Sequence, residues 1–85
     1  MDLMTMTTQD LVRKLAALLQ VAPEALEPSM GPDDIEEWDS LATLDIISFL
    51  DDAGAKNITA EEGDGLRTIG NIIVFAKTRG IVSDA

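Results

Sequence analysis

The spacing of the apolar residues is the feature that most constrains the fold of this 85-residue chain. In the first third of the chain, four leucines recur at the spacing of one helix face: Leu11, Leu15, Leu18 and Leu19. Thr7 or Thr8 is suited to cap such a helix, since a hydroxyl accepts a free backbone N–H at a helix start. Pro23 cannot continue it, so we expect the helix to end near Gln20 or Val21.

A second helix is predicted from Asp39-Ser40 to about Ala53, where Gly54 follows. This segment is apolar on two faces. The stripe that we assign to the core is Ile46, Phe49, Leu50 and Ala53. The other stripe is Leu41, Leu44 and Ser48, with Asp45 beside it. One stripe suffices for the core of a small bundle, so the second is expected to be available for a partner, with core packing of Leu44 as the alternative.

Two further helices are predicted in the last third of the chain. Thr59 and Glu62 have the spacing of a capping box, and the glycines at 63 and 65 keep the helix that they start short. Thr68 is suited to cap a last helix that Gly80 ends. The core stripe of that helix is predicted to be Ile69, Ile72, Ile73 and Ala76.

The connection between the first two helices is long. Residues 22 to 39 contain all three prolines and irregularly spaced apolar residues, which predicts a loop that packs onto the helices, with at most one turn at Pro23 to Leu26. No segment shows the alternation of apolar and polar residues that is typical of a strand. We therefore expect one all-α domain over residues 1–85: a small four-helix bundle with a long first loop, a short third helix and a frayed segment at residues 1–6.

The composition excludes several kinds of chemistry. The chain has no histidine and no cysteine, which excludes Ser-His and Cys-His dyads, zinc sites built on thiolates or imidazoles, and disulfides. A chain of this length also leaves little room for an enclosed cleft. We expect a protein that is not an enzyme by itself and that holds no metal.

The charge is strongly negative. Sixteen Asp and Glu against six Lys and Arg give a net charge of −10. Half of the acids lie between residues 33 and 52, a segment without a basic residue: Asp33, Asp34, Glu36, Glu37, Asp39, Asp45, Asp51 and Asp52. Such a surface repels the phosphates of nucleic acids and favours a basic protein partner.

The sequence also bears on location. No apolar run approaches the roughly 20 residues of a membrane span, and the first residues lack the basic start and apolar stretch of a signal peptide. We expect a cytoplasmic monomer that binds neither membrane nor nucleic acid.

Ser40 is the candidate for chemistry. If Asp39 caps the second helix, its carboxylate accepts the free N–H groups and leaves the Ser40 hydroxyl pointing outward at the first helical position. A phosphate on that oxygen would be stabilised by the helix N-terminus. The alternative is an ordinary helix start in which Ser40 itself is the cap.

The order of helices, the segment Trp38-Asp39-Ser40-Leu41 and the segment Leu66-Arg67-Thr68-Ile69 resemble the acyl carrier protein family over roughly residues 8–80. The resemblance implies that Ser40, beside the capping Asp39, is esterified by a 4′-phosphopantetheine arm whose thiol carries acyl groups as thioesters. By the family pattern, the residues that meet partner enzymes are Leu41, Leu44, Asp45, Ser48, Asp51 and Asp52. The implied partners are a phosphopantetheinyl transferase and the acyl-transferring, chain-extending or tailoring enzymes with basic docking patches.

Further details bear on the type of carrier. Trp38 before Asp-Ser-Leu is similar to free-standing carriers of polyketide type, and the chain begins with its own Met1, so we expect a free-standing carrier for polyketide or related biosynthesis, with fatty-acid biosynthesis as the alternative pathway. Asp51-Asp52-Ala53-Gly54 departs from the family in lacking an aromatic residue. The alternative function is an acidic helical adaptor that binds a basic protein through the second helix and leaves Ser40 unmodified.

Overall fold

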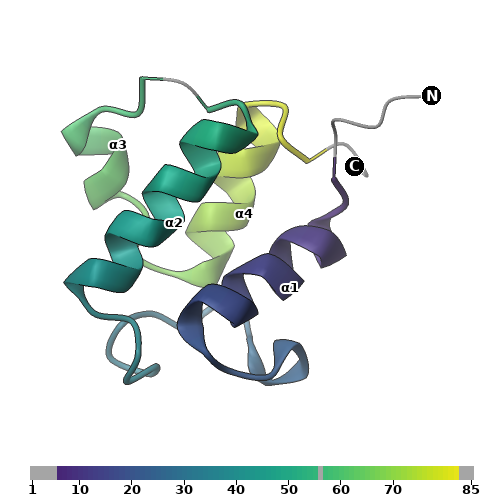
Figure 1. Cartoon of the computed structure of the whole chain (residues 1–85), viewed down its shortest axis with the longest axis vertical. Coiled ribbons are helices and arrows are strands. Elements are labelled where there is room, and N and C mark those ends of the chain that lie inside the picture. The colour runs from purple at the N-terminus through teal and green to yellow at the C-terminus, as the bar shows by residue number, and fades with distance from the viewer. Residues whose placement is uncertain (1–5, 56, 83–85) are drawn as a thin grey trace.

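The structure, a computed structural model, describes residues 6–55 and 57–82. In these residues the chain forms four α-helices and one short 3-10 helix, without a strand (Figure 1). The elements are α1 Thr8–Leu19, η1 Pro23–Ala25, α2 Ser40–Ala53, α3 Ala60–Asp64 and α4 Ile69–Thr78. The prediction of a small all-α globule with four helices is confirmed.

The two ends of the described chain meet. Met6 forms an isolated parallel bridge with Val82, and its N–H donates to the Ile81 carbonyl oxygen at 3.3 Å. For Met6 the prediction of a frayed segment is therefore corrected, because its backbone is paired with the segment after α4. The rest of that predicted segment, residues 1–5, lies outside the described residues.

Helix α1 begins at the predicted place. Thr7 is its N-cap: Thr7 Oγ1 accepts the Asp10 N–H at 3.0 Å, and the Asp10 carboxylate accepts the Thr7 N–H at 3.3 Å. The helix ends where Gln20 takes a left-handed conformation with φ of 60°. The predicted end near Gln20 or Val21 is confirmed, although the left-handed Gln20, and not Pro23 three residues later, ends the helix.

The stripe by which α2 enters the core differs in part from the predicted one. Its buried residues are Ala42, Ile46 and Leu50, at steps of four, whereas Phe49 and Ala53 are only half-buried. Phe49 lies at the edge of the core beside α1, and the Lys14 ammonium lies 5.5 Å from the centre of its ring. The buried face of α2 is therefore rotated toward Ala42 relative to the predicted face. Ala42 was not predicted to be buried because its small side chain contributes little to the apolar pattern.

The connection from residue 20 to residue 39 packs onto the helices through Ile35 and Trp38, which are both buried. It is also tied to the start of α4. The Ile69 N–H donates to the Met30 carbonyl oxygen at 2.9 Å, and the Gly70 N–H donates to the Pro28 carbonyl oxygen at 2.8 Å. Loop carbonyls thereby satisfy N–H groups that lack a partner within the first turn of a helix.

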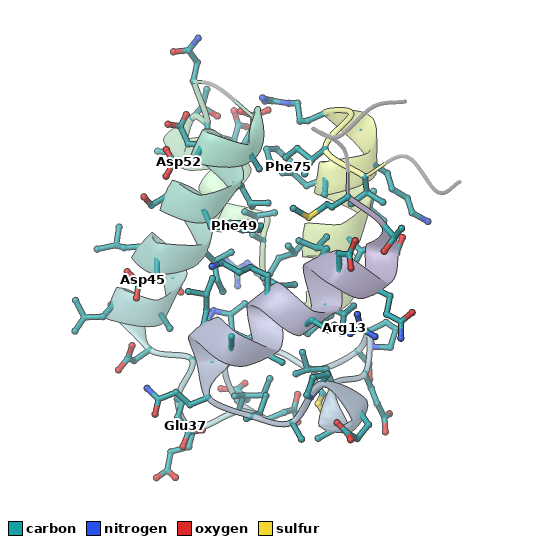
Figure 2. All side chains as sticks on the ribbon, turned by 45° about the vertical axis from the view of Figure 1, so that its right-hand side comes forward. Arg13, Glu37, Asp45, Phe49, Asp52 and Phe75 are labelled. Carbon is teal, nitrogen blue, oxygen red and sulfur yellow. The ribbon has the colours of Figure 1, made fainter. Side chains whose placement is uncertain are left out.

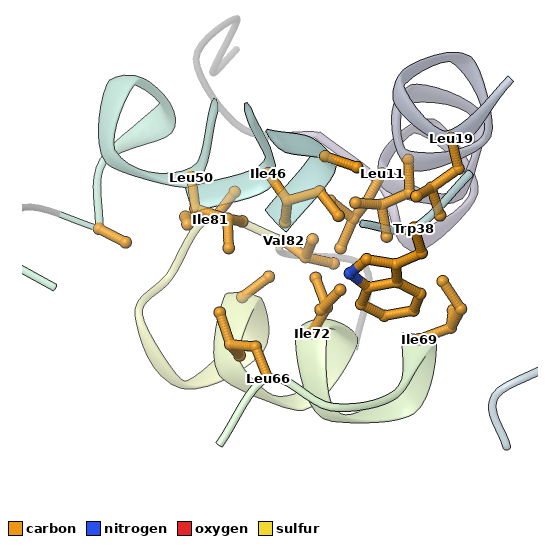
Figure 3. Close-up of a cluster of buried hydrophobic side chains, with 14 of the residues drawn as sticks. Leu11, Leu19, Trp38, Ile46, Leu50, Leu66, Ile69, Ile72, Ile81 and Val82 are labelled. Carbon is orange, nitrogen blue, oxygen red and sulfur yellow. The ribbon is translucent and has the colours of Figure 1, made fainter. Parts of the chain in front are cut away.

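One apolar cluster joins α1, the long connection, α2 and α4. Figure 3 shows the Trp38 indole between the leucines of α1 and the isoleucines of α4. Ile69, Ile72 and Ala76 are buried as predicted, while Ile73 is only half-buried at the edge of the cluster. The short α3 lies beside α2 and adds no buried residue to the core (Figure 1).

Among the helices in the described part of the chain, none has both the length and the apolar character that crossing a bilayer requires.

Candidate functional site at the start of α2

The start of α2 is defined by Asp39. Its backbone is extended, with φ of −101° and ψ of −168°, and its Oδ1 accepts the Ala42 N–H at 2.9 Å. The Asp39 carbonyl oxygen also accepts the Thr43 N–H at 3.0 Å. Asp39 is therefore the N-cap and Ser40 the first helical residue, so the arrangement with Ser40 as the cap is absent. The Ser40 residue is exposed.

Trp38 fixes the same turn from the core side. Trp38 is 4% exposed, and its Nε1–H donates to Thr43 Oγ1 at 3.1 Å. A buried indole N–H needs an acceptor, and Thr43 supplies one from the first turn of α2. The segment before Ser40 is thus held by both a backbone cap and a side-chain hydrogen bond. The second of these was not anticipated from the sequence, although the pairing of a tryptophan with a threonine five residues later was a possible signal.

The outer face of α2 carries two exposed leucines. Leu41 is 72% exposed and Leu44 is 61% exposed, so the alternative of core packing for Leu44 is excluded. Ser48 is exposed one turn beyond Leu44. Two large apolar side chains left in solvent beside each other are unusual enough to suggest an interaction surface.

Acidic residues follow these leucines along α2. Asp45 and Asp52 are exposed, and Asp51 is half-buried. Figure 2 shows Asp45 and Asp52 on the outer side of α2, pointing away from the core. Because the sequence has no basic residue between 15 and 55, these carboxylates repel one another along the helix without a neighbouring cation in the same segment.

The loop acids that precede α2 are arranged differently. Asp34 Oδ2 accepts the Gly31 N–H at 3.0 Å, which gives this carboxylate a structural role within the connection. Figure 2 shows Glu37 at the far end of the molecule from Asp52. The acid-rich segment of the sequence is therefore divided between the end of the bundle and the outer face of α2.

An open hollow of about 240 Å³ lies between α2 and α3. Its lining is Thr43, Ile47, Ile58, Thr59, Ala60, Gly63 and Asp64. Ser40, Thr43 and Ile47 follow one another at helical steps of three and four residues, so they lie on one side of α2. The exposed hydroxyl of Ser40 thus stands on the side of the helix that leads into the hollow.

The sequence did not predict this hollow. Its two walls approach closely at Gly63, where an added Cβ would lie 3.3 Å from Ile47 Cδ1. A glycine inside a short predicted helix was the available signal, because a glycine in such a place often marks a close approach of two segments.

Chemically, the start of α2 offers an accessible hydroxyl at a helix N-terminus, beside an apolar and acidic face. An anionic group such as a phosphate can be attached to this hydroxyl without loss of stability, because the N–H groups of the first turn and the helix dipole favour negative charge there. No protein-family model matches this chain, and comparisons with curated proteins and with solved structures gave no match.

Proposed function

We propose that this protein is an acyl carrier protein whose Ser40 is esterified by 4′-phosphopantetheine. One observation carries the proposal: Ser40 is the exposed first residue of α2, and its hydroxyl is left free because Asp39 supplies the cap. The resemblance in sequence supplies the identity of the group. We also propose that the bundle, with its long connection before α2 and its short α3, has the fold of an acyl carrier protein.

The residues present fit the attachment of a phosphate ester. The Ser40 oxygen attacks the phosphorus that bears the pantetheine in coenzyme A, the bond between that phosphorus and the bridging oxygen breaks, and adenosine 3′,5′-bisphosphate leaves with the bridging oxygen. The hydroxyl proton passes to a base of the transferase. The ester then stands at the helix N-terminus, an interaction of roughly 0.3–1 kcal/mol at an exposed site.

The chemistry of the arm complements the composition of the chain. When bound, it supplies a thiol that carries an acyl group as a thioester. The chain itself has no cysteine, so no thiol of its own competes for the acyl group. The side of α2 that joins Ser40 to Ile47 leads an attached group toward the hollow beside α3, where the aliphatic side chains of Ile47 and Ile58 can contact an apolar cargo.

The outer face of α2 serves as the docking surface in this proposal. Leu41 and Leu44 provide apolar anchors, and the acids around them select partners with basic patches. Charges at the rim of an interface act mainly on the rate of encounter and on specificity, which suits a carrier that visits several enzymes in turn. We place the protein in the cytoplasm, as a monomeric carrier for polyketide or related biosynthesis.

The test is a transfer assay with a fluorescent coenzyme A analogue and a broad-specificity phosphopantetheinyl transferase. The protein is expected to become labelled, Ser40→Ala to remain unlabelled, and Ser29→Ala to be labelled like the parent. Ser29 is the matched control because it is an exposed serine that lies outside α2 and its docking surface. Absence of label on a folded sample with several transferases would favour the acidic adaptor.

A further inference from the structure

Helix α3 is held to the domain in an unusual way. It has five residues, and alone among the four α-helices of the described chain it has no buried residue. A helix of this length is not stable by itself in water. Ile58 before α3 and Leu66 after it pack on the core, but no residue of the helix itself is buried, so polar contacts contribute to fixing its position.

Glu62 makes polar contacts that hold α3, in addition to the bond that Arg67 Nε donates to the Asp64 carbonyl oxygen. Its Oε1 accepts the Thr59 N–H at 3.0 Å and lies 3.3 Å from Thr59 Oγ1, which closes the capping box of α3. Its Oε2 pairs with the guanidinium of Arg79, at the end of α4. One carboxylate thus both starts α3 and joins it to a residue seventeen positions later, at the end of α4. These contacts also lower the pKa of Glu62, first through the Thr59 N–H and then through Arg79.

The Arg79 side chain is well placed to act as an anchor. It follows α4 directly as the C-cap residue, and its guanidinium lies 4.8 Å from the centre of the Phe75 ring. The side chain is 27% exposed, and that of Glu62 is 35% exposed, so the pair is partly shielded from water. A shielded pair is weakened less by salt than a fully exposed one.

The residue after Glu62 forms a wall of the hollow beside α2. Any Cβ at Gly63 would lie 3.3 Å from Ile47 Cδ1, so the two helices approach closely there. A shift of Glu62 away from Arg79 therefore moves Gly63 relative to Ile47 and changes the width of the hollow.

We propose that Glu62 and Arg79 are a positioning pair that holds α3 toward α4 and thereby sets the width of the hollow between α2 and α3. The use of this hollow for an acyl cargo rests on the proposed function, whereas the positioning role does not. Loss of the pair is expected to loosen α3 while the rest of the bundle stays folded.

The experiment uses the unmodified protein and NMR. Amide hydrogen exchange is measured for Gly63, Gly65 and Leu66, whose N–H groups donate to carbonyl oxygens within or next to α3. Glu62→Gln keeps an acceptor for the Thr59 N–H but removes the charge. We expect exchange in α3 to become about fivefold faster, the upper end for loss of one ion pair, with no change in α2. The contact between the Ile47 δ-methyl and the Gly63 α-protons is expected to weaken.

Matched variants separate positioning from a general loss of stability. Glu61→Gln removes the same charge from the same helix and leaves the Arg79 pair in place, so it is expected to exchange like the parent. Arg79→Gln is expected to behave like Glu62→Gln, and Arg79→Lys is expected to restore much of the protection. If the parent shows no protection in α3, or if Glu62→Gln leaves both the exchange and the Ile47 contact unchanged, the proposal is overturned. Failure of Ser40 to be modified would leave this result intact, so the two proposals fail independently.

Discussion

The cap at Asp39 leads to a quantitative prediction. Asp39→Ala removes the carboxylate oxygen that lies 2.9 Å from the Ala42 nitrogen, while Asp39→Asn removes the same charge but keeps an oxygen acceptor. Because the two variants have the same net charge, the difference between them isolates the hydrogen bond of the cap from the relief of charge repulsion in this acidic protein.

The expected size of the effect follows from the geometry. A cap with a well-formed hydrogen bond contributes about 1 kcal/mol, within a range of roughly 0.5–2 kcal/mol. For a domain of this size, 1 kcal/mol shifts the unfolding midpoint by about 4–8 °C. We therefore expect Asp39→Ala to melt about 4–8 °C below Asp39→Asn.

Thermal unfolding followed by circular dichroism at 222 nm, at one fixed salt concentration, measures this difference. Equal melting temperatures for the two variants would refute the assignment of Asp39 as the cap. A melting temperature of Asp39→Asn below that of Asp39→Ala would refute it more strongly, since only the variant that lacks an acceptor should lose the bond.

Other perturbations have expected outcomes of their own. Leu50→Ala, at a fully buried position, is expected to cost about 2–5 kcal/mol in urea unfolding, whereas Leu44→Ala is expected to cost little; equal losses would contradict the assignment of the two faces of α2. Gly31→Ala is expected to destabilise the fold, because its Cβ would lie 2.5 Å from the Arg67 carbonyl oxygen; an unchanged melting temperature would argue against that close approach. Moderate salt is expected to raise the melting temperature by screening the net charge of −10, and a melting temperature insensitive to salt would contradict this. The lowered pKa of Glu62 means that its contribution to stability is present above the usual pKa of a glutamate and is lost as the pH falls through the lowered value. A carbon-13 titration is expected to show a higher Glu62 midpoint in Arg79→Gln, and an unmoved midpoint would contradict the pairing.

Local signals in the sequence located the helices well. Thr59 and Thr68 mark helix starts as predicted, and the choices that the sequence left open resolved to Thr7 and Asp39. These predictions succeed because a cap depends on residues only three positions apart.

Contacts between segments far apart in the sequence could not be predicted from such local signals. The ties from Met30 and Pro28 to the start of α4 join segments some forty residues apart, and no local pattern encodes them. The pair of Glu62 and Arg79 likewise depends on how α3 and α4 come together. No local pattern around Arg79 points to α3, so this link was not predicted.

The candidate site was predictable in part. The position of Ser40 at the helix start follows from local sequence, but the exposure of Leu44 does not, because α2 is apolar on two faces and only tertiary packing decides which one is buried. For the same reason, Ala42 joins Ile46 and Leu50 in the core, whereas Phe49 and Ala53 of the predicted stripe are only half-buried. The hollow beside Ile47 depends on where α3 lies and had no local signature beyond Gly63.

The most direct test of the central claim is the mass of the peptide that contains Ser40, taken from protein isolated from the cells that produce it and fragmented to locate any added group. We predict a peptide heavier by one phosphopantetheine, with the addition on the Ser40 oxygen. An unmodified Ser40 peptide, found in cells that contain an active phosphopantetheinyl transferase, would contradict the carrier assignment.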